Sequence, residues 1–180
     1  MKQLYFMMTA VLLFSCKNQN QIDTEKFIAK RVSKTEVIQL NGNVEKVFPL
    51  FGAFEERKWA DGWQPRLIYP STEIIEEGAI FKTHGHGHHE DEFLWMVIKY
   101  QPKEYLVQYL VSTLNRVWTI TVKCVPASNA SSAQITYSYT GLNSIGNQIN
   151  PFAMQTIYKH DLKDWEEAIN YYLKTGKTLK

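Results

Sequence analysis

Six segments that alternate between apolar and polar residues, separated by short turns, constrain the fold of this chain more than any other feature. They span residues 67–75, 79–84, 92–101, 105–113, 116–125 and 133–142. A period of two is typical of a β-strand with one buried face. Connections such as 101–104 are too short for a crossover, so neighbouring strands should pair antiparallel. The sequence therefore predicts an antiparallel sheet with one apolar and one more polar face.

The alternation also indicates which side chains share the apolar face. On one strand these are Trp118, Ile120, Val122 and Cys124, and on the next they are Ile135, Tyr137 and Tyr139. A cysteine on such a face is a small apolar packing group, so we expect Cys124 to be a buried thiol and not a nucleophile. An apolar face of this size needs a cover from another element.

The cover is predicted to be a helix over residues 151–175. Leu162, Trp165 and Ile169 recur at intervals of three and four, which gives a single apolar stripe. Asn150 is a suitable N-cap, the proline after it suits the first helical position, and Gly176 suits a left-handed C-terminus. A helix of about 25 residues is roughly 37 Å long at about 1.5 Å per residue.

A further strand and two short helices precede the alternating segments. Residues 35–40 have the composition of a first strand, and the Asn-Gly-Asn that follows is a turn signal. Apolar residues at helical spacing then begin at Val44, but Pro49 removes a backbone donor inside the segment. The sequence therefore predicts two short helical pieces within residues 44–59.

Composition limits the classes of protein to which the chain can belong. It has 180 residues, of which 44% are hydrophobic and 13% aromatic, enough for one packed domain. Lys and Arg number 20 against 18 Asp and Glu, without a basic run. Because nucleic-acid binding normally requires a concentrated basic surface, we expect no nucleic-acid partner.

The amino terminus has the pattern of an export signal. Lys2 precedes an apolar run over residues 4–14, and the run ends in Leu13-Phe14-Ser15-Cys16. This ending resembles the bacterial lipobox, in which the signal is removed and the cysteine is lipidated. We therefore expect a signal peptide over 1–15, a lipidated Cys16 with a polar tether over 16–32, and a domain over 33–176 anchored to a membrane of the bacterial cell envelope. The alternative is an ordinary cleaved signal with a cysteine nearby by chance.

A histidine-rich stretch lies between two of the predicted strands. His84, His86, His88 and His89 are interrupted by two glycines and followed by Glu90-Asp91-Glu92. Imidazole with nearby carboxylate suits zinc, nickel or copper. A glycine-rich hairpin tip is poorly suited to fixing ligands, so the favoured interpretation is a loop that binds metal only adventitiously. We expect no cofactor.

The order of elements resembles the helix-grip fold of the START, polyketide-cyclase and birch-pollen-allergen superfamily, also called SRPBCC. The likeness extends over residues 33–175 and includes four short stretches: 47–51, 57–65, 95–97, and 137–140 followed by Gly146-Asn147. The resemblance implies an α+β domain in which a curved antiparallel sheet of about seven strands wraps around a long C-terminal helix. It also implies a cavity between them that takes a small hydrophobic or amphipathic ligand.

Aromatic residues are the candidates for lining that cavity. They are Trp118, Tyr137, Tyr139, Phe152, Tyr158 and Trp165, with Trp59 and Trp63 near the mouth. The alternative for each is plain core filling. Gln108, Arg116 and Lys99 are the polar residues amid the apolar runs, and spacing alone indicates no catalytic set. We therefore predict a membrane-anchored ligand-binding protein; the alternatives are a cyclase- or hydrolase-type enzyme on the same fold and a metal-binding module.

Overall fold

A single antiparallel sheet forms the main layer of the computed structural model, which describes residues 26–87 and 90–180. Seven strands follow one another in the order β1-β7-β6-β5-β4-β3-β2. Their bounds are β1 Arg31–Leu40, β2 Arg66–Tyr69, β3 Ile80–Gly87, β4 Glu90–Gln101, β5 Leu106–Ser112, β6 Arg116–Pro126 and β7 Ser131–Gly141. The expected antiparallel arrangement is confirmed, and β1 is an edge strand that pairs with β7.

Two strands differ from their predicted ranges. The segment predicted as a strand over 67–75 leaves the sheet after Tyr69, because Pro70 follows and has no N–H for the ladder. The first strand begins at Arg31, four residues earlier than predicted and within the predicted tether. Lys30 N–H donates to Asn147 Oδ1 at 2.9 Å, and Asn147 Nδ2 donates to Ile28 O at 3.0 Å. The chain is therefore fixed to a helix even before β1 begins.

Short helices connect β1 to the rest of the sheet, as expected. α1 (Val44–Val47) runs directly into a 3-10 turn, η1 (Phe48–Phe51), and a second such turn, η2 (Glu55–Lys58), follows. A further turn, η3 (Pro102–Glu104), joins β4 to β5. The proline predicted to break the helix lies in the first turn of η1.

The C-terminal helix is longer than predicted. It comprises α2 (Ser144–Thr156), a π-helical turn η4 (Ile157–Asp161) and α3 (Leu162–Thr175) without interruption. The prediction of Asn150 as N-cap is wrong, because the side chain of Asn143 caps the helix by accepting from Gly146 N–H at 3.0 Å. Pro151 therefore lies inside α2. The left-handed terminus is confirmed at Gly176, with φ 68°.

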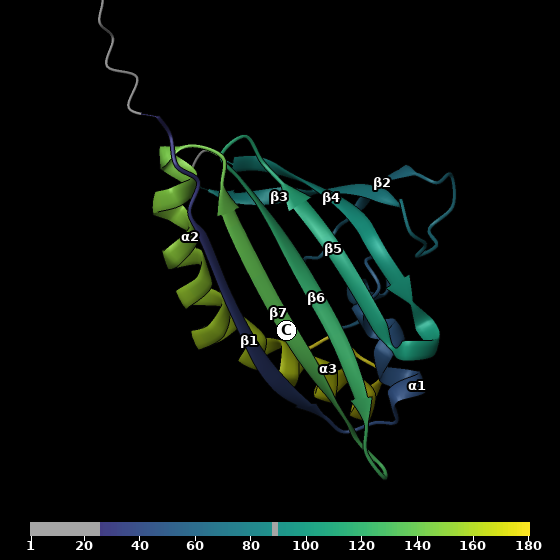
Figure 1. Cartoon of the computed structure of the whole chain (residues 1–180). Helices are drawn as coiled ribbons and strands as arrows, with labels where there is room; N and C mark the ends of the chain where they lie inside the picture. Colours follow the sequence, from purple (N-terminus) through teal and green to yellow (C-terminus); the bar gives the residue numbers. More distant parts are fainter. Residues whose placement is uncertain (1–25, 88–89) are drawn as a thin grey trace, which may run out of the picture.

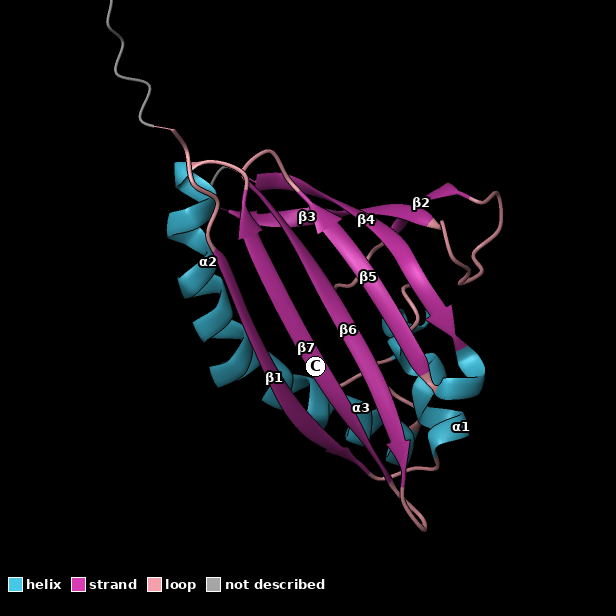
Figure 2. Cartoon of the chain, viewed as in Figure 1, coloured by secondary structure: helices cyan, strands magenta, loops and turns pink. Residues whose placement is uncertain are grey.

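The helices cover one face of the sheet (Figure 1). α2 packs on β7 and β1, and α3 crosses β1 farther along. Figure 2 shows that the other face of the sheet carries no helix in this view. The predicted alternation on β6 and β7 is confirmed, since every second side chain is buried. Burial raises the pKa of the Cys124 thiol to about 12, as expected of a packing group.

Within residues 26–87 and 90–180, no helix is both long and apolar enough to cross a bilayer.

Candidate ligand-binding interior

Strand register places the inward side chains of the sheet in rows beneath the helices. One row runs from Tyr109 on β5 through Ile120 on β6 to Tyr137 on β7. The next row, two residues along each strand, contains Val111, Trp118 and Tyr139. Strand pairing thus assembles an aromatic wall from residues that are far apart in the sequence.

Three of the predicted lining residues contact one another on this wall. The rings of Trp118 and Tyr139 lie 5.4 Å apart between centroids, and those of Tyr137 and Tyr139 stack at 5.9 Å. Phe93 meets Trp118 edge to face at 5.3 Å. Such pairs add to the stability gained from burial and hold the rings in fixed positions.

Tyr158 lies at the margin of the wall and joins the helix to the sheet. Its ring meets Tyr137 edge to face at 6.2 Å. Its hydroxyl accepts from Tyr137 N–H at 3.1 Å and donates to Lys34 O, two groups that stand opposite each other in the β1–β7 pairing. Tyr158 therefore inserts its hydroxyl into the ladder between these strands, which fixes η4 to the sheet.

The predicted mouth residues form separate aromatic pairs. Trp59 is 2% exposed, donates from Nε1 to Leu50 O at 2.7 Å and meets Trp165 of α3 at 5.7 Å. Trp63 donates to Ala53 O at 2.6 Å and meets Trp95 at 5.5 Å. Both tryptophans thus fix the segment after α1 against its neighbours.

Phe152 does not line the interior, and this prediction needs correction. Its side chain is 71% exposed. The buried residues of α2 are Gly146, Asn150 and Met154, at intervals of four. Phe152 is two residues from the nearest of them, which places it about 200° around a helix of about 3.6 residues per turn. It therefore lies on the outer side of α2.

The inward residues of β6 and β7 are buried along the whole concave face. Trp118, Ile120 and Tyr139 are 5%, 4% and 3% exposed. Ala133 and Ile135, nearer the start of β7, are 0% exposed. The aromatic wall is thus buried in the core, like the rest of this face.

A buried ion pair adjoins the wall. Arg116, the first residue of β6, is 7% exposed, and Glu90, the first residue of β4, is 3% exposed. Nε of Arg116 donates to both carboxylate oxygens, at 3.1 and 3.0 Å, and Nη2 donates to Oε2 at 2.6 Å. Thr113 adds a hydroxyl donor to Oε1 at 2.7 Å. The remaining nitrogen, Nη1 of Arg116, is buried without a hydrogen-bond partner.

Asn150 provides further unpaired polar atoms on the helix side. It is 2% exposed, and neither Oδ1 nor Nδ2 has a hydrogen-bond partner. A buried amide without partners costs about 1–3 kcal/mol, so such groups are rare in natural proteins. Its position follows from the early start of α2, which turns Asn150 toward the sheet.

Glu56 of η2 brings a carboxyl group to the other row of the wall. Burial raises its pKa well above the ordinary value of 4.5. Burial also raises the pKa of Tyr109 and of Tyr137, and the charge of Glu56 contributes to both shifts. The interior thus has a guanidinium beside one aromatic row and a carboxyl group near the other.

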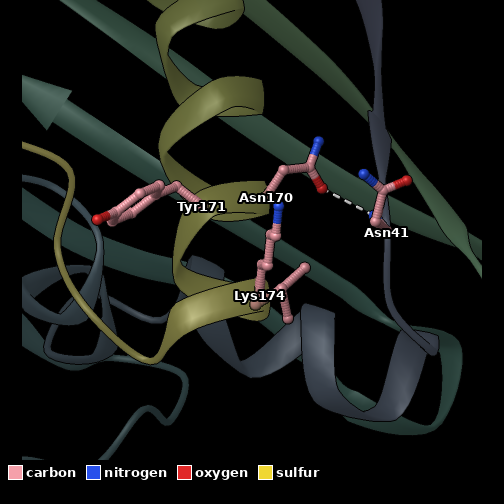
Figure 3. Close-up of a pocket in the computed structure, with 5 residues that line it drawn as sticks. Asn41, Asn170, Tyr171 and Lys174 are labelled. Carbon is pink, nitrogen blue, oxygen red and sulfur yellow. Dashed lines mark hydrogen bonds between the residues drawn. The ribbon is translucent and has the colours of Figure 1, made fainter.

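The groove in Figure 3 lies between the end of β1 and the last turns of α3. Asn170 Oδ1 accepts from Asn41 N–H at 2.8 Å, and Asn170 Nδ2 donates to Gln39 O at 2.9 Å. Its amide is therefore used to fix α3 to the strand, and this groove is a less suitable ligand site than the interior.

The remaining predicted site residues are only partly within the described residues. His84 is exposed near the end of β3, while Cys16, His88, His89 and the signal segment lie outside the described residues. Among residues 26–87 and 90–180, no group of three or more His, Cys, Asp or Glu side chains is arranged to hold a metal ion. The lipidation and metal hypotheses therefore stay predictions.

Comparison with known proteins identifies the fold. No protein-family model matches the chain, and no curated protein matches it either. Norcoclaurine synthase from Thalictrum flavum superimposes with a TM-score of 0.62 at 12% identity, covering 98% of this chain and 100% of that one. The fold is a Bet v 1-like helix grip. The predicted fold class is thereby confirmed.

Two further structures share this helix-grip fold. Ara h 8.0201 has a TM-score of 0.57 at 13% identity, covering 81% of this chain and 99% of that one. A putative uncharacterized protein from Rhizobium leguminosarum has a TM-score of 0.55 at 14% identity, covering 82% and 99%. At such identities the likeness extends to the fold alone.

Sequence reasoning missed several residues of the interior. Glu90 was noted only among the carboxylates that follow the histidine-rich stretch, Asn150 was assigned to a helix cap, and Glu56 was not singled out. Arg116 was recognised only as a polar residue amid an apolar run. An isolated charge at the inward phase of a strand is the signal that could have marked it, since such a charge needs a buried partner.

Proposed function

We propose that this domain binds a small, mainly apolar molecule between the sheet and the C-terminal helix. The observation that carries the proposal is a buried aromatic wall with the Arg116 guanidinium beside it, together with unpaired buried polar atoms in Arg116 and Asn150. An apolar pocket with a few polar groups is the usual form of a small-molecule site. The norcoclaurine synthase structure holds dopamine and hydroxybenzaldehyde, which are small aromatic molecules.

The test is saturable binding of a naphthalene-type fluorescent probe, followed in two variants that enlarge one side chain each. Ile120→Phe adds volume at the centre of the aromatic wall, where we propose that the ligand lies, so we expect it to weaken probe binding about tenfold with little loss of stability. Val122→Phe is the matched control two residues farther along β6, opposite Ile135 and away from the Trp118 row, where overpacking should cost about 1–3 kcal/mol. Absence of probe binding, with equal destabilisation by both variants, would show that the aromatic residues are plain core.

A second candidate is an enzyme of the cyclase or hydrolase type. The observation favouring it is Glu56, a carboxyl group near the aromatic rows whose pKa is raised by burial, since shifted pKa values are common among groups that transfer protons. The same binding experiment separates the two functions when the probe is recovered and its mass measured. A binder returns the probe unchanged, whereas an enzyme returns an altered molecule from probes that carry a reactive carbonyl or ester.

We further propose that lipidation of Cys16 holds the domain at a membrane of the cell envelope. The support is the sequence alone: an apolar run that ends in a lipobox-like Leu13-Phe14-Ser15-Cys16. Cys16→Ser should move the protein from the membrane fraction to the soluble fraction with an unchanged melting temperature. Lys17→Ser is the matched control and should stay with membranes. Equal membrane recovery of the Cys16→Ser variant and the wild type would remove the proposal.

A further inference from the structure

Arg116 is the first of two residues that leave buried hydrogen-bonding capacity at one end of the interior. Glu90 engages Nε and Nη2, so the bidentate edge of the guanidinium is occupied. Nη1 is on the opposite side of the planar group and has no partner. The guanidinium carbon lies 4.8 Å from the ring centroid of Trp118 and 5.4 Å from that of Tyr139. The unpaired donor is therefore beside the aromatic wall.

Asn150, the second of these residues, lies at the same end of the interior as Arg116. Gly146 packs against the backbone of Asn115 and Gly141, because a Cβ built on it would come within 1.9 Å of Asn115 O and 3.1 Å of Gly141 Cα. Asn150 is one turn farther along the same buried face, about 6 Å at about 1.5 Å per residue. Tyr139 is two residues back along β7, a similar distance at about 3.3 Å per residue. Asn150, a buried residue of α2, is therefore at about the same level along the fold as Tyr139.

The net charge at the Arg116 end of the interior limits which chemical groups of a ligand can bind there. Glu90 neutralises Arg116 in a bidentate pair, so the pair has no net charge to offset an incoming anion. Burying a carboxylate in an apolar interior is costly without such an offset. An uncharged acceptor, such as a ketone or aldehyde oxygen, can accept hydrogen bonds from Arg116 Nη1 and Asn150 Nδ2 without that cost.

We propose that Arg116 and Asn150 form a subsite for the carbonyl oxygen of the bound molecule. The inference rests on the proposed ligand-binding function and specifies its ligand class: a small aromatic or polycyclic molecule with an uncharged carbonyl group at one end. The rings lie along the wall of Trp118 and Tyr139, and the oxygen meets the two unpaired donors.

The test compares two probes of matched shape, 2-acetylnaphthalene and 2-isopropylnaphthalene, in which a methyl group replaces the carbonyl oxygen. The selectivity is the Kd of the isopropyl probe divided by the Kd of the acetyl probe. This ratio should be about tenfold larger in the wild type than in the Asn150→Leu variant, equivalent to about 1.4 kcal/mol. Asn150→Leu should also raise the melting temperature, since it removes unpaired buried atoms. If Asn150 had only a structural role, Asn150→Leu would not lower the selectivity for the acetyl probe while raising the melting temperature.

A second variant tests the arginine without leaving a charge unpaired. Arg116→Met with Glu90→Met replaces the whole pair by apolar groups, which proteins often tolerate. It should fold and should also lose the preference for the acetyl probe. Gln155→Leu, on the exposed side of α2, is the matched control and should keep the wild-type selectivity.

The outcomes separate this inference from the proposed function. Binding of both probes with a Kd ratio that is the same in the wild type and in both interior variants overturns the carbonyl subsite and leaves the ligand-binding function in place. Tighter binding of 2-naphthoate than of 2-acetylnaphthalene overturns the inference of an uncharged acceptor. Failure of every probe to bind overturns both proposals.

Discussion

Arg116→Met alone should lower the free energy of unfolding by about 3–5 kcal/mol, the usual cost of breaking a buried ion pair from one side. In the wild type, the Glu90 carboxylate accepts hydrogen bonds from two Arg116 nitrogens and from the Thr113 hydroxyl. The variant would leave this carboxylate buried without a positively charged partner. Glu90→Met should cost a similar amount for the opposite reason, since it leaves the guanidinium without a counter-charge. Urea denaturation at neutral pH measures both values.

The double variant is the most decisive test of this prediction. Arg116→Met with Glu90→Met should regain most of the stability lost in either single variant, because no buried charge is left. Arg66→Met, which removes an arginine that pairs with Glu92 while 72% exposed, is the control and should cost less than about 1 kcal/mol. Single variants that each lose no more than this control would mean that water reaches the pair.

The sheet was predictable because its signal is local. On β6 and β7 every second side chain is buried, so alternation in the sequence alone indicates the strands and their inward faces. Trp118, Tyr137 and Tyr139 were placed correctly on that basis. Strand ends were less predictable, and the segment after Tyr69 shows why: a single proline outweighed the alternation that continues beyond it.

The pairing of Arg116 with Glu90 was not predictable in the same way. The two residues are 26 apart in the sequence, and β5 separates their strands in the sheet. Whether their side chains meet depends on where β4 and β6 begin, which no local pattern specifies. The sequence identified the arginine as unusual, but only the strand register identifies its partner.

The start of the C-terminal helix shows how two valid local signals compete. Asn150 followed by Pro151 is a good helix start, and so is Asn143 followed by Ser144. The earlier start prevails because Gly146 allows the first turn to pack directly on Asn115 and Gly141, a tertiary contact that propensity does not contain. The error changed two assignments at once, since Asn150 became an interior residue and Phe152 an exterior one.

Gly146→Ala should therefore destabilise the protein by about 3 kcal/mol, the upper end of the range for overpacking. In an ordinary helix interior the same change stabilises by about 1 kcal/mol, so the expected sign is reversed. The added Cβ would come within 1.9 Å of Asn115 O. That carbonyl cannot retreat freely, because it accepts from Leu142 N–H at 2.8 Å. Either the hydrogen bond or the seating of α2 must be lost.

Gln148→Ala is the control for this prediction, since it lies two residues along the same helix on an exposed side and should change stability by less than about 0.5 kcal/mol. Displacement of the first turn would also move Asn150, one turn farther on, away from the aromatic row. Gly146→Ala should consequently weaken the acetyl probe more than its isopropyl counterpart. A Gly146→Ala variant that is more stable than the wild type, with unchanged probe selectivity, would show that α2 does not depend on close contact with Asn115.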